Sequence, residues 1–252
     1  MIGVFDSGVG GLTVLHALRE LLPSSDVVYF GDTKNAPYGV RSREELGRLS
    51  VQGLQFLQEH GATNIISACN SVSASLAISL FDALSIAPQQ LIEMVGPTVG
   101  YFKGSSRRLI LCATPATINS EIYQSGFRMI GKEVEYIAIE DLAGAIERGA
   151  PKADIDLIIR NAFQDFTFQT DDVLILGCTH YPLVIDSFRA VLGNIFIFDP
   201  ARAVAERAER LFWPQEVGDR TTRFYISAES PVFRSYVAAL FSDDDYSIEV
   251  AG

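Results

Sequence analysis

The sequence is poor in cysteine and in positive charge. Three cysteines in 252 residues cannot form an all-paired disulfide framework, and a chain of this size does not need one. Lysine and arginine number 20 against 31 acidic residues, so the net charge is −11. A surface of that sign repels phosphate backbones unless a local basic patch offsets it, and no such patch is found. We therefore expect reduced thiols and no nucleic-acid partner.

Long apolar runs are also missing. No stretch approaches the roughly 18 apolar residues in a row that a membrane helix needs. The opening MIGVFDSG has no basic region and too short an apolar run for a signal peptide. The expected location is the cytoplasm, without a membrane partner. Hydrophobic residues still make up 48% of the chain and charged residues 20%, which provides for a packed core and excludes a disordered chain.

Short apolar runs alternate with amphipathic stretches along the whole chain, which predicts an α/β fold with parallel sheets covered on both faces. The expected strands are 2–5, 27–30, 64–68, 93–96, 108–113, 134–139, 173–176, 195–198 and 223–227. The expected helices are 12–22, 46–59, 71–84, 115–126, 141–148, 155–166, 183–192, 201–212 and 231–241. Turn formers predict an exposed loop at 31–39, and the acidic residues 243–245 predict a solvated end.

The best candidates for a domain boundary are Gly96-Pro97 and the polar stretch 103–108. We expect two doubly wound lobes, one made of residues 1–96 plus 208–252 and the other of residues 97–207. The lobes should be related by approximate two-fold symmetry, with the functional site between them, a common location for ligand pockets.

Two cysteines stand in matching settings. The segments 65–71 (IISACNS) and 174–180 (LILGCTH) each lead from an apolar run through a small residue to Cys69 or Cys178, and then to polar residues that can cap a helix. Both cysteines are therefore expected at the carboxyl end of a parallel strand, where open α/β sheets bind ligands. The partial positive charge of the following helix N-terminus favours a thiolate there.

A lone cysteine at a strand end is more often a packing residue than a reactive one. Two in equivalent settings with polar neighbours favour chemistry, whereas Cys112 lies inside the apolar run 109–113 and is interpreted as core. No metal is expected, because close ligand pairs such as C-x₂-C are missing, and a redox pair lacks C-x-x-C. Two thiols facing each other across a cleft can remove a proton from one side of a carbon and deliver one to the other.

Four segments, taken in order, resemble the aspartate/glutamate racemase family: DSGVGGLTV at 6–14, GDT with PYG at 31–39, ACNS at 68–71 and LGCTHYPL at 176–183. The similarity extends from residue 2 to about residue 240. It implies two flavodoxin-like lobes and racemisation of L- and D-glutamate by two thiols, without pyridoxal phosphate or another cofactor. The product would be D-glutamate for peptidoglycan biosynthesis. Members of the family often dimerise, which makes a second copy of the chain a candidate partner, although the sequence itself does not fix the oligomeric state.

The resemblance also assigns roles by position. Cys69 and Cys178 would each serve one enantiomer, with Asp6 assisting Cys69 and His180 assisting Cys178. Glu147 is the counterpart of the family's acidic assistant, and Glu140 is the alternative. The positions that would hold the substrate's carboxylates and amine are Asp6, Ser7, Pro37, Tyr38, Gly39, Asn70, Ser71, Thr114, Thr117, Thr179 and His180.

Two other functions stay open at the level of sequence. One is a racemase or epimerase of another amino acid, such as aspartate or diaminopimelate, on the same scaffold. The other is a non-catalytic relative that only binds a ligand, since a shared scaffold does not guarantee activity. A pyridoxal phosphate enzyme is disfavoured, because no lysine stands in a convincing active-site motif.

Overall fold

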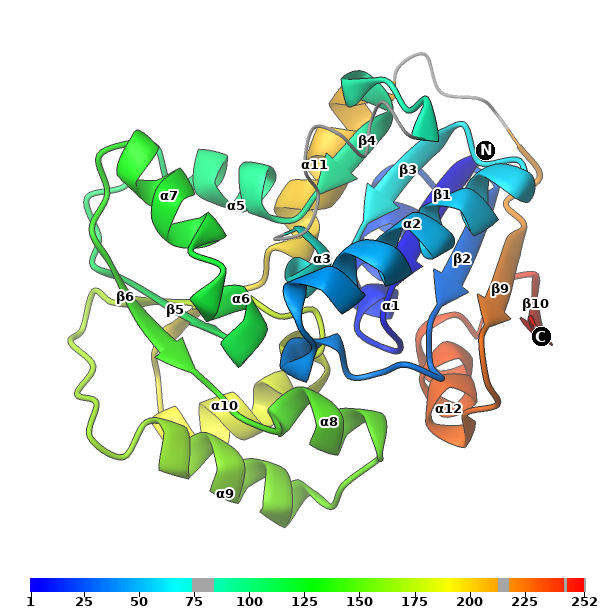
Figure 1. Cartoon of the computed structure of the whole chain (residues 1–252). Helices are drawn as coiled ribbons and strands as arrows, with labels where there is room; N and C mark the ends of the chain where they lie inside the picture. Colours follow the sequence, from blue (N-terminus) through cyan, green and yellow to red (C-terminus); the bar gives the residue numbers. More distant parts are fainter. Residues whose placement is uncertain (74–83, 213–217, 243, 252) are drawn as a thin grey trace.

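Two parallel sheets form the centre of the molecule (Figure 1). The computed structural model describes residues 1–73, 84–212, 218–242 and 244–251. The first sheet has the order β10-β9-β2-β1-β3-β4, and its strands are β1 (Ile2–Asp6), β2 (Val27–Gly31), β3 (Asn64–Ser67), β4 (Leu91–Glu93), β9 (Thr222–Ile226) and β10 (Tyr246–Val250). The second has the order β6-β5-β7-β8, with β5 (Leu109–Ala113), β6 (Val134–Ala138), β7 (Val173–Leu176) and β8 (Phe196–Phe198). Every strand pair is parallel, which confirms the predicted α/β fold.

Helices connect the strands and cover the sheets. They are α1 (Gly11–Leu21), α2 (Arg43–Glu59), α3 (Asn70–Ser73), α5 (Val95–Tyr101), α6 (Pro115–Asn119), α7 (Ile122–Met129), α8 (Leu142–Glu147), α9 (Lys152–Ala162), α10 (Ile185–Leu192), α11 (Ala201–Leu211) and α12 (Pro231–Leu240). A 3₁₀ helix at Tyr181–Val184 precedes α10. Among the described residues, no helix is long and apolar enough to span a membrane.

The two sheets share one strand order. In the first sheet it is β2-β1-β3-β4, and in the second it is β6-β5-β7-β8, so β3 and β7 hold equivalent places. Each sheet changes winding direction beside its first strand, and ligands of such folds bind at the carboxyl ends of the strands at that point. Cys69 follows β3 and Cys178 follows β7, so both cysteines lie where their own sheet favours a ligand.

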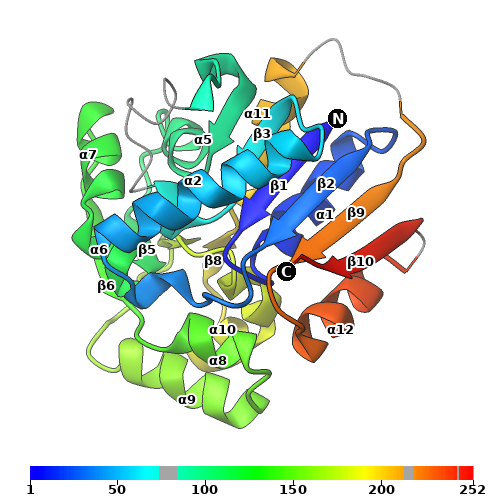
Figure 2. The same cartoon turned by 45° about the vertical axis from the view of Figure 1, so that its right-hand side comes forward.

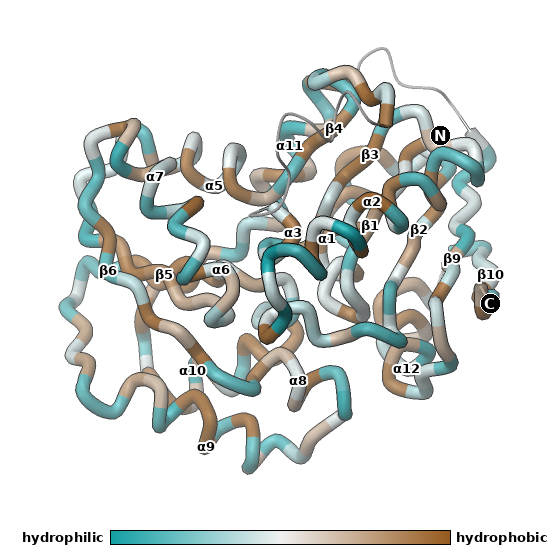
Figure 3. Tube along the Cα trace, viewed as in Figure 1, coloured by the Kyte–Doolittle hydropathy of each residue, from teal (hydrophilic) through white to brown (hydrophobic). Residues whose placement is uncertain are grey.

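Helices pack on both faces of the first sheet, and the strand sequence shows why. Successive residues of β1 enter different cores: Val4 packs in the cluster that contains Leu15 of α1, and Phe5 packs in the cluster that contains Leu54 of α2. Side chains alternate across a strand, so a strand that is apolar throughout is covered on both faces. Figure 2 shows α2 lying across one face of β1 and β2, and Figure 3 shows the central strands largely in the hydrophobic colour.

Two glycines of α2 give a matched test of this packing. A Cβ added at Gly53 would overlap the ring of Phe5, whereas a Cβ at Gly47 would meet nothing within 4 Å. We expect Gly53→Ala to lower the free energy of unfolding by about 1 to 3 kcal/mol through overpacking. Gly47→Ala should raise it by about 0.5 to 1 kcal/mol through lower backbone entropy in the unfolded chain. Urea unfolding measures both, and equal effects would contradict the close approach of α2 to β1.

The predicted strand at 93–96 is wrong. The strand found there is β4, which ends at Glu93, and α5 begins at Val95. The reason is the Glu93 carboxylate, which accepts hydrogen bonds from the backbone N–H groups of Val95 and Gly96 at 2.5 and 2.6 Å and so starts a helix. The candidate boundary at Gly96-Pro97 therefore lies inside α5. The predicted helix 115–126 is likewise two helices, because Glu121 between α6 and α7 adopts φ +56°.

The loop 31–39 is not exposed as predicted. Tyr38 is buried, its ring packs edge-on against Phe5, and its hydroxyl donates to the carboxylate of buried Asp32 at 2.6 Å.

The acidic end is also not simply solvated. Residues 246–250 form β10 beside β9, and the Asp244 carboxylate pairs with Arg220 at 2.6 Å and with buried Arg19 at 3.6 Å. Predicted helix 71–84 is seen only at Asn70–Ser73, because residues 74–83 lie outside the described residues.

The chain passes from one sheet to the other twice, between β4 and β5 and between β8 and β9. The polar stretch 103–108 lies in the first passage, between α5 and β5. The predicted limits 96/97 and 207/208 fall inside α5 and α11. The division into lobes 1–96 plus 208–252 and 97–207 stays a prediction, to be tested by whether the two parts unfold separately in calorimetry.

Candidate active site

Cys69 lies at the carboxyl end of the first sheet and is 5% exposed. Its sulfur is 3.9 Å from the hydroxyl oxygen of Ser7, which follows β1. Burial raises the pKa of the Cys69 thiol, and the nearby charge of Asp6 raises it further, against the lowering by hydrogen bonds from the Val72 backbone and Ser7. The predicted helix N-terminus effect is therefore outweighed, because desolvation of a thiolate costs more than one turn of helix returns. The surroundings of Cys69 therefore favour the thiol over the thiolate.

Cys178 has a different environment in the second sheet. Its sulfur is 3.6 Å from Nδ1 of His180, and Nε2 of the same ring is 2.6 Å from the Glu147 carboxylate. Burial lowers the pKa of His180, but the hydrogen bonds and charges of Cys178 and Glu147 raise it well above its usual value. The three side chains thus form a line from a carboxylate through an imidazole to a thiol. That arrangement can move a proton to and from sulfur.

Asp6 ends β1 and is fully buried. Its carboxylate accepts hydrogen bonds from the Gly8 backbone N–H at 2.9 Å and from the Thr179 hydroxyl at 3.1 Å. Burial raises its pKa, while His180 and the Gly8 hydrogen bond lower it. Thr179 belongs to the second sheet, so this bond joins the two halves of the site.

A second contact between the sheets comes from Glu147 at the end of α8. Its carboxylate accepts the Val9 backbone N–H at 2.9 Å, in addition to its bond with His180. A Cβ on Gly8 would overlap this carboxylate. A side chain at position 8 would therefore displace the Glu147 carboxylate from its bonds to Val9 and His180.

Three hydroxyl groups meet on the opposite side of the site. Ser71 comes from the first sheet and Thr114 and Thr117 from the second, with oxygen–oxygen distances of 3.1 to 3.3 Å. Thr114 caps α6 by accepting the Thr117 backbone N–H. A Cβ on Gly39 would lie 2.6 Å from Thr114, so the loop that carries Tyr38 also reaches across to the second sheet.

These groups enclose one cavity between the sheets. It is lined by Ser7, Pro37, Tyr38, Gly39, Cys69, Asn70, Ser71, Thr114, Ala143, Cys178, Thr179 and His180. Both cysteines line it, although they are 109 positions apart in the sequence (178 − 69). Its volume is about 10 Å³, room for about one water molecule, so an amino acid can enter only if the groups that line the cavity move apart.

The structure brings all the predicted site residues together. Asp6, Thr117 and Glu147 do not line the cavity but bond directly to residues that do. Glu140, the alternative to Glu147, is exposed. Sequence reasoning missed Ala143, which lines the cavity, and two tyrosines that bond to site residues: Tyr29, whose hydroxyl donates to the Gly8 carbonyl, and Tyr123. Tyr29 lies in an apolar strand and Tyr123 on the buried side of an amphipathic helix, so nothing in the pattern separates their hydroxyls from packing.

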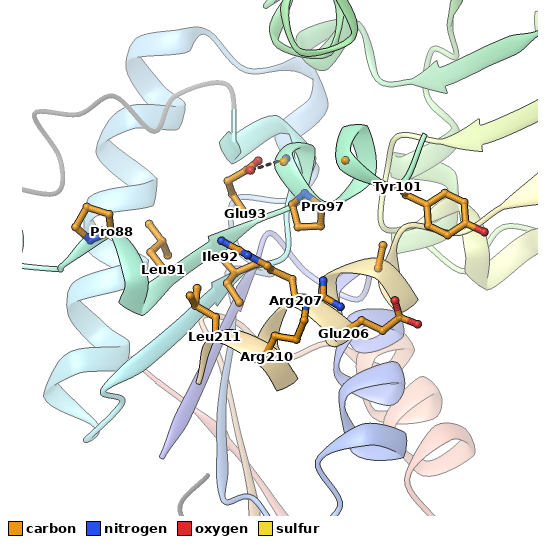
Figure 4. Close-up of a pocket in the computed structure, with 13 residues that line it drawn as sticks. Pro88, Leu91, Ile92, Glu93, Pro97, Tyr101, Glu206, Arg207, Arg210 and Leu211 are labelled. Atoms are coloured by element: carbon orange, nitrogen blue, oxygen red, sulfur yellow. Dashed lines mark hydrogen bonds between the residues drawn. The ribbon is translucent and has the colours of Figure 1, made fainter. Parts of the chain in front are cut away.

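A larger cavity of about 540 Å³ lies elsewhere, between β4, α5 and α11 (Figure 4). Arg207 and Arg210 of α11 and Tyr101 of α5 line it, and no predicted site residue does. Among the described residues, no group of three His, Cys, Asp or Glu side chains is placed to hold a metal ion.

The buried thiols predict a loss of stability in alkali. Burial raises the pKa values of Cys69 and Cys112 in the folded chain above the roughly 8.5 of an unfolded thiol. Below about pH 8.5 both thiols are protonated in the folded and the unfolded chain, and the free energy of unfolding does not depend on them. Above that pH the free energy of unfolding falls by up to about 1.4 kcal/mol per pH unit for each thiol, because only the unfolded chain loses the protons. Melting temperatures should therefore fall from about pH 8.5 upward. In Cys112→Ala the melting temperature should fall less steeply with pH than in the unaltered chain. An equally steep fall would show that the buried Cys112 thiol is not a cause.

The two sheets place one thiol each, at equivalent strand ends, on a single cavity. Such a site suits an enzyme that inverts a carbon centre, which is a racemase or epimerase. Comparison with known proteins agrees. The model of the Asp/Glu/Hydantoin racemase family matches residues 3–208, and the chain belongs to this family.

Individual relatives give the same result. A glutamate racemase of Aquifex aeolicus is 36% identical over 208 residues, which cover 81% of this chain and 80% of the relative. A glutamate racemase structure from Aquifex pyrophilus has a TM-score of 0.82 and 30% identity over 99% of this chain and 98% of the other. A structure from Francisella tularensis, a glutamate racemase in complex with D-glutamate, has a TM-score of 0.86 and 28% identity over 100% of this chain and 97% of the other.

Proposed function

We propose that this chain racemises glutamate by proton transfer between its α-carbon and two cysteines, and that it supplies D-glutamate for peptidoglycan biosynthesis. One observation carries the mechanism: Cys69 and Cys178, at equivalent strand ends of the two sheets, line the same cavity. Family membership and the glutamate racemases among the relatives support the choice of substrate.

The proton balance needs no other group. In one direction the thiolate of one cysteine takes the α-proton, and the electron pair stays on the α-carbon as a carbanion. The thiol of the other cysteine then delivers its proton to the opposite face. The product has the inverted configuration, and the thiol and thiolate have exchanged places. The reverse reaction uses the same two groups in the opposite order, so each cysteine serves one enantiomer.

The two cysteines have different assistants in this proposal. His180 lies beside Cys178 and can hold the proton that the thiol gives up, with Glu147 keeping the imidazole charged and oriented. Asp6 is close enough to Cys69 to raise its pKa. A positive charge close to Cys69 would stabilise its thiolate, and the ammonium group of the substrate provides one.

The remaining predicted residues hold the substrate in this proposal. Hydroxyl and amide donors suit carboxylates, and a carboxylate in a closed, low-dielectric site gains more from each donor than it would in water. Closing the sheets over the substrate also expels water, which strengthens the electrostatic stabilisation of the carbanion. The donors of this set are Ser7, Asn70, Ser71, Thr114, Thr117 and Thr179, with Pro37, Tyr38 and Gly39 forming the wall of the loop after β2.

The direct test follows purified protein with L-glutamate in D₂O and no added pyridoxal phosphate. We expect chiral chromatography to show equal amounts of the two enantiomers at equilibrium, with deuterium at the α-carbon of the product. A panel with aspartate and diaminopimelate decides the substrate. A chain that binds glutamate but leaves its α-proton in place in D₂O would overturn the proposal in favour of a binding protein.

Two further expectations remain proposals. Association into a homodimer is implied by the family resemblance, and light scattering at micromolar concentration tests it. A cytoplasmic location is supported by the three cysteines, which are all free thiols in the structure. Fractionation of the source cells tests the location.

A further inference from the structure

The Asn70 side chain is incompletely bonded. Asn70 follows Cys69 directly, is 3% exposed and lines the cavity between the sheets. Its amide nitrogen Nδ2 is buried and has no hydrogen-bond partner among the described residues. A buried N–H group without a partner is costly, and where it lines a cavity it indicates that a ligand supplies the acceptor.

The other end of the same amide is fixed. The Tyr123 hydroxyl donates to Asn70 Oδ1 at 2.6 Å. Tyr123 is completely buried, in an apolar cluster with Val99 and Phe127. Its oxygen also interacts with the Thr98 side chain, while its own proton is donated to Asn70. Loss of the Asn70 bond would leave that buried donor without its acceptor, which costs free energy. The tyrosine thus determines which end of the amide faces the cavity.

The position of Tyr123 depends on the second half of the molecule. It belongs to α7, which packs against α5 where Gly126 approaches Val99 so closely that a Cβ would lie 3.0 Å from it. Asn70, in contrast, follows β3 of the first sheet. The hydrogen bond therefore connects the two halves of the molecule beside Cys69, and Figure 1 shows α7 next to α5 on one face of the second sheet.

We infer that Tyr123 is a positioning residue, which holds the Asn70 amide so that its N–H groups point into the cavity and donate to a carboxylate of the substrate. This inference rests on the proposed function for the identity of the substrate. An amide nitrogen is a donor only, so it suits a carboxylate and not an ammonium group. Without the tyrosine hydroxyl, the amide can turn its carbonyl oxygen toward the carboxylate, which then meets an acceptor in place of a donor.

The test is a double-mutant cycle read out by glutamate affinity. Tyr123→Phe should raise KM and the calorimetric Kd for D-glutamate about tenfold, which corresponds to about 1.4 kcal/mol. The kcat should change less than threefold, because the reacting thiols are untouched. In an Asn70→Ala background the same change should have no further effect on KM, since Tyr123 acts only through Asn70. Tyr225→Phe, a buried tyrosine of β9, is the matched control and should leave KM unchanged.

Several outcomes would overturn the inference. One is an unchanged KM and Kd in Tyr123→Phe, and another is an equal rise in KM with and without Asn70. If Tyr123→Phe does not fold, Asn70→Asp replaces it: a carboxylate held by Tyr123 should repel the substrate and weaken binding more than Asn70→Ala. Wild-type-like affinity in Asn70→Asp would show that no donor is needed. Failure of the proposed function gives a different result. The unaltered chain would then not racemise glutamate, and calorimetry would still measure how Asn70 and Tyr123 affect glutamate binding.

Discussion

Cys69→Ala and Cys178→Ala should each lower the rate of glutamate racemisation by about 10³-fold or more, in both directions. A positioned acid or base contributes roughly 10²- to 10⁴-fold to a proton transfer, and inversion needs both cysteines in every turnover. Loss of either one should therefore stop the reaction in both directions, even though each cysteine meets only one enantiomer. Circular dichroism of glutamate solutions follows the rate directly.

Cys112→Ala is the matched control for these variants. Cys112 is a third buried thiol, in β5, and it does not line the cavity. Its backbone carbonyl accepts the N–H of Gly177 beside Cys178 at 2.8 Å, a bond that alanine keeps. Its replacement should therefore leave the racemisation rate within about twofold, because only a side chain outside the cavity is lost. If either active-site variant keeps the wild-type rate, the two-thiol mechanism is wrong, whatever the fold.

Glu147→Gln should lower the racemisation rate by about 10- to 100-fold, the range expected from the loss of a charge-assisted hydrogen bond of about 1.5 to 3 kcal/mol. The carboxylate of Glu147 raises the pKa of His180, so the neutral amide should let that pKa fall. His180 then loses its proton at a lower pH, and the alkaline limb of the pH–rate profile should move in the acid direction. Initial rates between about pH 6 and 9.5 measure this shift.

Glu140→Gln is the control for Glu147, because both acids lie in the segment between β6 and α9 and only Glu147 reaches His180. Glu140 is exposed, so its neutralisation should leave both the rate and the pH profile unchanged. Equal losses in the two variants would contradict a specific role for Glu147.

The parts of the fold that sequence predicted well are those where periodicity and burial agree. Residues 2–5 of β1 and all of β5 and β7 carry no polar side chain able to ionise at neutral pH and lie between helices, and these short strands alternate with stretches of clear helical spacing. The errors come from single side chains whose hydrogen bonds and ion pairs the periodicity does not show. The Glu93 carboxylate begins a helix at Val95, and Arg19 together with Arg220 binds the Asp244 carboxylate that looked like part of a solvated end.

The sequence predicted which residues form the candidate site, but not how burial and neighbouring charges change their pKa values. Matching motifs name Cys69 and Cys178, and the structure places both at one cavity. The sequence places each near a helix N-terminus, which favours a thiolate, but it does not show that Cys69 is buried close to Asp6. It also leaves Glu147 and Glu140 as alternatives, because only the path of α8 shows which carboxylate reaches His180.

The strand order has a consequence for the growing polypeptide. β2 pairs on one side with β1, which precedes it, and on the other side with β9, which is synthesised nearly 200 positions later. Until then the apolar edge VVYFG of β2 has no neighbour, and an unpaired edge of that kind invites association with other chains. Synthesis therefore includes a period in which one edge of β2 is open to other chains, and it ends when β9 pairs with that edge.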